Sequence, residues 1–284
     1  MIGDLRFKNS GIVGKALIII FLILMIGYSL LVLFPLFNMI ISSFKTTREI
    51  FKTPYSLPEI WKYSNYMEVW NKGGFGGYFF NSIIITSLSI GVVLLFGSMA
   101  AFGIARYRYR LSNLVYLIFL AGIMLPLKAA IIPLFLLIRG IGLMNTRSAL
   151  VLIFTAMSMP ATVFILAGFM RTIPGSLEDA ARIDGSNDLG IYWRIIMPLT
   201  TPSIALVTIY NAVPIWNDFF FPLVFIQSDK LKPLPLGMSV FFGQYQISWH
   251  LLFASLSVAI LPMLILYLFM AKYFIRGMTA GAIK

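Results

Sequence analysis

From Ala16 to Ile41 the chain has no charged side chain and is almost entirely apolar. A helix needs about 20 apolar residues to cross the hydrocarbon core of a bilayer. This segment is too long for the apolar core of a signal peptide, and no small-residue cleavage site follows it. It therefore predicts a transmembrane helix near the start of the chain.

Further apolar segments follow, separated by polar connections. A shorter stretch, Ala129–Ile138, is flanked by Lys128 and Arg139, which favours an interfacial or re-entrant segment over another crossing. The sequence thus predicts an all-α membrane protein, a bundle of six transmembrane helices with a cytoplasmic helical loop, in a single domain over residues 1–284. The expected spans are residues 16–41, 78–105, 111–127, 149–170, 203–226 and 251–271.

The composition indicates a lipid environment. Hydrophobic residues make up 60% of the chain and charged residues 11%, against about 45–50% and about 25% in soluble domains. A soluble fold of this size cannot hide so much apolar surface. The net charge of +12 does not indicate nucleic acid, because the basic residues are scattered in short loops. We interpret them as topology signals and headgroup contacts.

The chain has no cysteine and one histidine. The absence of cysteine excludes disulfides and thiolate metal sites. His250 has no second histidine with which to share a metal ion, so we interpret it as a polar residue at a membrane edge and predict no metal site. A membrane-embedded enzyme would need clustered His, Asp or Glu side chains at membrane depth. The expected spans hold no such cluster, so no catalytic residue is predicted.

Orientation follows from the connection after the second expected span. Arg106, Arg108 and Arg110 lie there without an acidic residue, and short loops this basic stay in the cytoplasm. Alternation of the spans then places both termini and the long connection 171–201 in the cytoplasm. The connection 45–77 is expected outside, as short interfacial helices packed over the bundle.

The span interiors lack the charges on which ion-driven carriers depend. Only Asp218, in the outer half of the fifth expected span, stands out. A secondary carrier would need a carboxylate relay or paired broken helices, and a selective channel would need a ring of carbonyls or charges. The sequence also lacks a G-x-x-x-x-G-K-[ST] nucleotide-binding loop. The energy for transport is therefore expected to come from a separate chain.

The expected cytoplasmic loop contains signals for two short helices. Ser176 with Asp179 resembles a capping box, and Gly185 lies where a helix C-cap is expected. Asp188 begins a second helix that should stop near Pro198. Spacings of three and four residues place small and apolar side chains on one face of the first helix, namely Leu177, Ala180 and Ala181.

An ordinary capped surface loop would show the same signals. Two features favour a functional loop instead. The loop has roughly 30 residues, and long loops are usually functional. Its small alanines form a helix face that permits close approach by another protein. We therefore predict a compact knob that contacts a protein partner.

The spacing in this loop resembles the EAA signature of binding-protein-dependent ABC importers, which is E-A-A, three residues, G, nine residues, I, one residue, L-P. Asp179-Ala180-Ala181, Gly185, Ile195 and Met197-Pro198 take these places. Two positions depart from the signature, since Asp179 replaces the glutamate and Met197 replaces the leucine. Glu178 keeps an acid one step earlier, so which acid contacts the partner stays open. The resemblance implies that the loop docks on an ATPase subunit through Glu178, Asp179, Ala180, Ala181, Asp184, Gly185, Ile195 and Pro198.

Other segments resemble the sugar-importer branch, near the maltose-permease class. They are Ile41–Thr46, Asn81–Thr86, Trp216–Leu223 and the carboxy-terminal T-A-G-A-I-K. In this family two homologous permease subunits form one path, two ATPase subunits carry ATP and Mg, and an extracytoplasmic solute-binding protein delivers substrate. The resemblance implies a permease subunit in the bacterial cell (inner) membrane, with no cofactor of its own.

Polar and aromatic residues in the fifth expected span are candidates for the substrate path, namely Asn211, Trp216, Asn217 and Asp218. An aromatic ring beside amides suits a sugar. The alternatives stay open, because tryptophan can anchor a helix at the interface and Asn or Asp can bond between helices. A glycerol-phosphate ester is a second candidate solute, but the span interiors offer no cationic patch. A channel or secondary carrier leaves the loop spacing unexplained.

Overall fold

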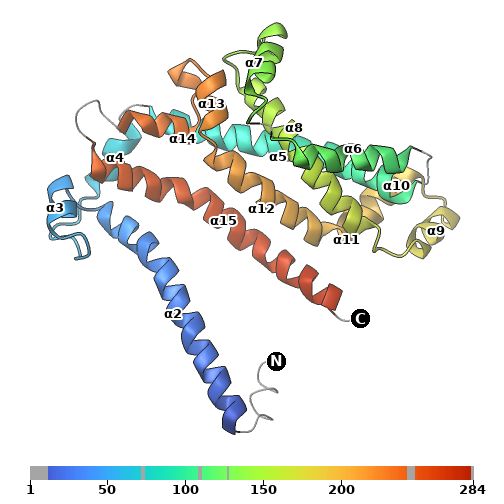
Figure 1. Cartoon of the computed structure of the whole chain (residues 1–284), viewed down its shortest axis with the longest axis horizontal. Helices are drawn as coiled ribbons and strands as arrows, with labels where there is room; N and C mark the ends of the chain where they lie inside the picture. The colour runs from blue at the N-terminus through green and yellow to red at the C-terminus, as the bar shows by residue number, and fades with distance from the viewer. Residues whose placement is uncertain (1–11, 72–73, 108–110, 127, 242–246, 283–284) are drawn as a thin grey trace. The chain divides into compact units, whose positions relative to one another are not determined.

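The computed structural model describes residues 12–71, 74–107, 111–126, 128–241 and 247–282. Helices joined by turns make up this part of the chain, and it contains no extended strand (Figure 1). The prediction of an all-α fold is confirmed. The chain forms two compact units, Met1–Val69 with Phe241–Val258 and Trp70–Val240 with Ala259–Lys284.

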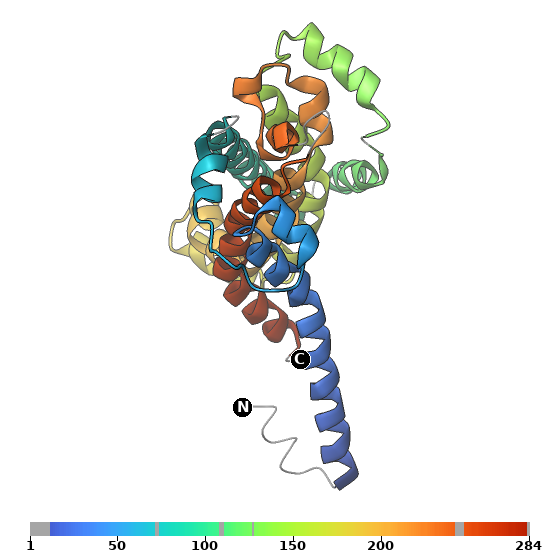
Figure 2. The ribbon, with the colours of Figure 1, turned by 90° about the vertical axis from the view of Figure 1, so that its left-hand side faces the viewer.

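The first unit begins with α2, Ile12–Ser42. The apolar side chains of this helix are exposed along its length, as expected for a helix that faces lipid. The next helix, α3, spans Thr47–Lys52 and lies beside the C-terminal end of α2 (Figures 1 and 2). The unit is completed by most of α4, Ser64–Asn71, and by the first turns of α15, Trp249–Ala282.

Two contacts join α3 to the start of α15 within this unit. His250 Nδ1 lies 2.8 Å from Thr47 Oγ1. The rings of Phe51 and Trp249 meet edge to face with centroids 5.8 Å apart, a favourable aromatic geometry. The single histidine therefore forms a polar link between two helices of the first unit.

The second unit is built on two long helices that pack closely, α5 and α8. A Cβ placed on Gly97 of α5 would lie 2.7 Å from the Thr162 methyl group of α8, so the glycine permits this approach. The elements are α5 Phe75–Arg106, α6 Ser112–Met124, α7 Ile131–Gly140, α8 Arg147–Met170, α9 Ser176–Ile183, α10 Asp188–Ile191, the π-helix η1 Tyr192–Ile196, α11 Met197–Leu199, α12 Thr201–Asn217, α13 Phe220–Phe225, the 3-10 helix η2 Asp229–Leu231 and α14 Leu234–Gly237. A further 3-10 turn, η3 Met238–Phe241, follows α14. The part of α15 from Ala259 onward also belongs to the second unit.

The count of six spans is not confirmed. Four described helices are long and apolar enough to cross a bilayer, and a fifth span results if one bent pair is counted as a single crossing. The four are Val13–Ser42, Phe75–Arg106, Arg147–Met170 and Trp249–Tyr273, and the pair is Asp188–Leu199 with Thr201–Asn217, bent by 74°. These helices still make the chain a multi-pass protein.

Two predicted spans differ from the structure. The third, 111–127, contains α6, which has 13 residues and is therefore only roughly 20 Å long; Leu127 lies outside the described residues. The fifth, 203–226, is divided into α12 and α13, because the backbone at Asp218 is extended. Arg108 and Arg110 of the topology signal also lie outside the described residues.

A test of the packing concerns Gly237 in α14. A Cβ at this position would lie 2.1 Å from the ring of Tyr78 in α5. We expect Gly237→Ala to destabilise the protein by about 1–3 kcal/mol through overpacking, measured as a lower Tm in detergent. Gly168→Ala in α8 is the control, since apart from its own helix no described atom lies within 4 Å of that Cβ. Equal Tm values for the two variants would contradict the packing of α14 on α5.

Candidate functional site

The loop between α8 and α12 is almost entirely helical. It consists of α9, α10, η1 and α11, and Figure 1 shows α9 and α10 together at one end of the second unit. A contiguous apolar cluster joins these helices to α5, α8 and α12. Its fully buried members include Leu166, Met170, Ile191 and Ile196. The loop is therefore a packed part of the unit, which agrees with the predicted knob.

The first helix of the loop, α9, begins and ends through backbone contacts. The predicted capping role of Ser176 is wrong, because the N-cap is Gly175 and makes no side-chain cap bond. At the other end Gly185 has φ +82°, which favours glycine. Its N–H donates to the Arg182 carbonyl at 3.1 Å, and the Ser186 N–H donates to Ala181 at 2.9 Å. This pair of bonds is a Schellman motif. The C-cap itself is Asp184 and Gly185 follows it in the left-handed conformation, so the predicted end of the helix at this glycine is confirmed.

The face of α9 that was predicted to approach a partner, namely Leu177, Ala180 and Ala181, is exposed only in part. Ala181 is buried, but Leu177 is 43% exposed and Ala180 is exposed too. The second buried residue of α9 is Glu178, three residues before Ala181 and therefore on the same face. The opposite face carries Leu177, Asp179, Ala180, Ile183 and Asp184, all of which are exposed.

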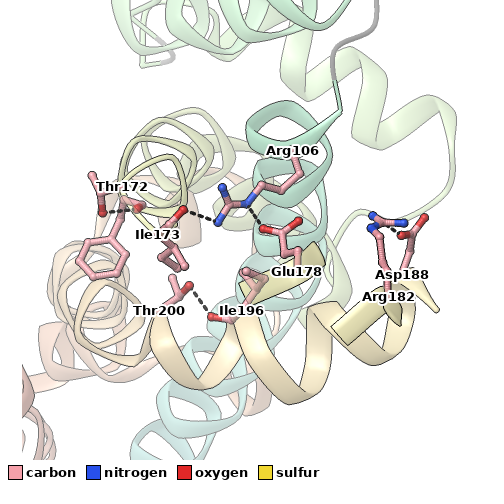
Figure 3. Close-up of polar contacts among 9 residues, drawn as sticks. Arg106, Thr172, Ile173, Glu178, Arg182, Asp188, Ile196 and Thr200 are labelled. Carbon is pink, nitrogen blue, oxygen red and sulfur yellow. Dashed lines mark hydrogen bonds and ion pairs between the residues drawn. The ribbon is translucent and has the colours of Figure 1, made fainter. Parts of the chain in front are cut away.

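Glu178 is buried because it forms an ion pair with Arg106 at the end of α5. Arg106 Nε lies 2.6 Å from Glu178 Oε1, and the two side chains are 12% and 10% exposed. Arg106 Nη2 also donates to the Ile173 carbonyl at 3.0 Å. Figure 3 shows the guanidinium between these two oxygen atoms. Each charge also suits its helix end, a cation in the last turn of α5 and an anion in the first turn of α9.

A second ion pair connects α9 to α10. Arg182 Nη2 lies 2.8 Å from Asp188 Oδ1, and both side chains are about half exposed (Figure 3). A hydrogen bond from Tyr107 and the neighbouring Arg182 lower the pKa of Asp188, so this carboxylate stays ionised at neutral pH. Asn187 caps α10, since its Oδ1 accepts the Gly190 N–H at 2.8 Å. The predicted helix start at Asp188 is confirmed.

The second helical stretch runs from α10 through η1 and α11 and ends at Leu199, so the predicted stop near Pro198 is confirmed. The chain then bends by 74° before α12. Pro202 has no N–H, so the Pro198 carbonyl instead accepts a bond from Thr201 Oγ1 at 2.7 Å. Thr200 Oγ1 donates to the Ile196 carbonyl at 2.6 Å (Figure 3). Side-chain hydroxyls thus satisfy the carbonyls at the bend.

Sequence reasoning did not identify the partners that hold the loop. Tyr192 in η1 is 2% exposed. Its hydroxyl lies 2.6 Å from Ser98 Oγ in α5, and its ring lies 5.4 Å from that of Phe102. Arg106 was interpreted only as a topology signal. No local pattern shows these pairs, because the partners lie far apart in the sequence.

Two of the predicted substrate-path residues are buried and bonded within the second unit. Asn211 Nδ2 donates to Thr162 Oγ1 of α8 at 3.0 Å and to the Val207 carbonyl at 2.9 Å. Trp216 Nε1 donates to the Ala259 carbonyl of α15 at 3.0 Å. The contacts of Asn211 favour the alternative in which this amide bonds between helices.

The other two predicted residues lie where α12 ends. Asn217 is exposed, and its Nδ2 donates to the Val213 carbonyl one turn earlier at 2.9 Å. Asp218 Oδ1 accepts the Phe221 N–H at 2.8 Å, which satisfies a free donor in the first turn of α13. The structure places the four residues along one segment but gives each a separate partner.

A cavity of about 560 Å³ lies between α5, α12 and α15 in the second unit. Of the four predicted residues, Trp216 lines it. The lining is mainly apolar but includes three hydroxyl side chains, Thr86 and Ser87 of α5 and Thr208 of α12. The remaining lining residues are Ile83, Ile90, Gly91, Ala212, Pro262, Met263, Ile265, Leu266 and Phe269.

Long apolar helices joined to a packed helical loop define this chain as a multi-pass membrane protein. Residues 93–280 match the family of binding-protein-dependent transport system inner membrane components. The chain belongs to this family.

Curated relatives cover most of the chain. It is 34% identical over 263 residues to the diacetylchitobiose uptake system permease protein NgcG of Streptomyces coelicolor, covering 92% of this chain and 87% of the relative. It is 36% identical to the melibiose/raffinose/stachyose import permease protein MelC of Bacillus subtilis, covering 88% of this chain and 91% of the relative. It is also 36% identical to the multiple sugar-binding transport system permease protein MsmG of Streptococcus mutans, covering 93% and 96%.

Solved structures show the same fold. The crystal structure of a bacterial ABC transporter that imports the acidic polysaccharide alginate contains a chain with a TM-score of 0.81 and 23% identity, covering 93% of this chain and 99% of that one. A chain from the crystal structure of a bacterial alginate ABC transporter in complex with an alginate pentasaccharide-bound periplasmic protein gives a TM-score of 0.65 and 15% identity. The match covers 93% of this chain and 95% of that chain.

Proposed function

We propose that this chain is the transmembrane subunit of an ATP-driven importer of sugars or oligosaccharides, and that the loop of α9–α11 couples it to ATPase subunits. One observation supports the coupling role above others. The helix α9 is held to the unit by buried Glu178 and Ala181, while its other face carries an acid and apolar side chains into solvent. A helix fixed on one side and free on the other can transmit a partner's motion.

The exposed face of the loop fits a protein partner. Ile183 is 86% exposed and Leu189 is 61% exposed, unusually large values for apolar side chains outside a lipid phase. Asp179 and Asp184 in the same loop are exposed as well. Because Glu178 is already paired with Arg106, we assign the contact with a basic group of the ATPase to Asp179.

The proposed assembly contains a second homologous permease subunit, two ATPase subunits that bind ATP and Mg, and an extracytoplasmic solute-binding protein. The solved alginate transporter with its periplasmic protein supports the last of these. We place the chain in the bacterial cell (inner) membrane with both termini in the cytoplasm. In this assembly ATP hydrolysis occurs on the partners.

We propose sugars and oligosaccharides as substrates because the relatives are named for uptake of diacetylchitobiose, of melibiose, raffinose and stachyose, and of multiple sugars. The glycerol-phosphate alternative has no support among them. For the path we propose the cavity at Trp216, where an indole ring and the hydroxyls of Thr86, Ser87 and Thr208 lie together. Such a mixed lining suits a sugar ring with apolar C–H faces.

The proposal is tested by purifying the chain from its native membrane in mild detergent and identifying the accompanying proteins by mass spectrometry. A second permease and an ATPase should be recovered. Vesicles containing that complex should take up an oligosaccharide only with ATP inside and the binding protein outside. Recovery of the chain alone, with sugar flux that needs no ATP, would contradict the proposal.

A further inference from the structure

The connection after α2 folds back along that helix instead of extending away from it. After α3 ends, the chain turns through Thr53–Leu57 and brings the ring of Tyr55 to 5.7 Å from that of Phe34 in α2. Tyr55 is 75% exposed and Phe34 is 54% exposed. This pair therefore lies on an open surface of the first unit, two helical turns before the end of α2.

A lysine holds this turn in place. Lys45 Nζ donates to the Thr53 carbonyl at 2.8 Å and lies 3.4 Å from the Pro54 carbonyl. The Lys45 side chain is fully buried. Its own carbonyl accepts a bond from Asn65 Nδ2 at 2.9 Å. The ammonium thus ties the turn that carries Tyr55 to the residues that follow the C-terminal end of α2.

The length of α2 gives the depth of this contact in a membrane. Lys15 is the last charged residue before the apolar run. From Ala16 to Phe34 the helix rises roughly 27 Å, and the hydrocarbon core is about 30 Å thick. Phe34 therefore lies near the boundary between hydrocarbon and headgroups on the side opposite Lys15. Tyr55 lies at the same depth.

The side chains around Tyr55 match that boundary. Phe51 and Leu57 are 65% and 63% exposed, and two basic side chains of α3, Arg48 and Lys52, are exposed beside them. Aromatic rings together with lysine and arginine are enriched where a membrane protein meets lipid headgroups. In water these apolar groups would form a costly patch.

From this geometry we infer that Thr47–Leu57, here named the anchor segment, inserts into the headgroup layer of the bilayer opposite Lys15, and that Lys45 is the residue that positions it. The molecules that contact this surface are phospholipids. The inference depends on the first unit alone and is independent of the proposed transport function.

The test uses the absence of cysteine from the chain. A nitroxide spin label on Tyr55→Cys in the full-length chain is measured in vesicles of phosphatidylethanolamine and phosphatidylglycerol. We expect the label to collide more often with oxygen, which partitions into lipid, than with a water-soluble nickel chelate. The same label on exposed Glu59→Cys should show the reverse, and one on Ile26→Cys in the middle of α2 should show the strongest preference for oxygen.

Two results would overturn the inference. If the label at position 55 met the nickel chelate as often as the label at 59, the segment would lie in water. If both relaxants were excluded, protein would cover it. Lys45→Met added to Tyr55→Cys should move the label at 55 toward the water pattern without changing the label at Ile26→Cys. An unchanged label at 55 would refute the positioning role of Lys45.

Discussion

Asp179→Lys should reduce ATP-driven uptake by at least about tenfold, because a close charge pair across a protein interface contributes more than 1.4 kcal/mol. The chain itself should remain folded. Asp179 is exposed on the outer face of α9, and its side chain makes none of the loop's ion pairs or hydrogen bonds among the described residues. Uptake into vesicles and the Tm of the purified chain are the two measurements, and only the first should change.

Glu59→Lys is the matched control for this variant. It reverses another exposed acid, in the first unit, so it alters net charge by the same amount and leaves the loop untouched. Its uptake should equal that of the wild type. If Asp179→Lys also transported normally, the assignment of the ATPase contact to this residue would be wrong, although membership of the permease family would stand.

The roles of the two acids could not be separated from the sequence. Glu178 and Asp179 are neighbours on a helix, so their side chains point about 100° apart, and either could face the partner. The choice depends on Arg106, which lies on another helix far earlier in the chain. Local spacing predicted Gly185 correctly because a left-handed C-cap requires only the residue itself and its own turn.

The helical character of the chain was predictable because lipid leaves the backbone no other way to satisfy its polar groups. The boundaries of the helices were less predictable from the sequence. The division of the fifth expected span depends on Asp218, whose side chain bonds the start of α13, and the bend before α12 depends on hydroxyls at Thr200 and Thr201. A hydropathy profile does not predict either of these breaks.

The candidate substrate path shows the same limit. Its hydroxyls, Thr86, Ser87 and Thr208, come from two helices and looked ordinary in sequence. Asn211 looked exceptional as a polar group in an apolar run, yet Thr162 on α8 binds its amide. A pattern within one segment identifies polar groups, but only packing shows whether they face a cavity or a neighbouring helix.

Glu178→Lys should destabilise the loop by about 3–5 kcal/mol, because it leaves the buried Arg106 guanidinium beside a like charge. Thermal unfolding of the purified chain should therefore begin earlier, and proteases should cleave between α8 and α12. Transport should fall as well, because the loop is less stable. This separates Glu178→Lys from Asp179→Lys, which should lose transport while the Tm is unchanged.

Exchanging the two charges provides the decisive comparison. Arg106→Glu combined with Glu178→Arg restores an ion pair between α5 and α9, so the double variant should be more stable than either single variant. The recovery should be partial. The exchanged charges oppose the dipoles at both helix ends, and the bond from Arg106 to the Ile173 carbonyl is lost. A double variant no more stable than the sum of the single losses would mean that the pair does not hold the loop.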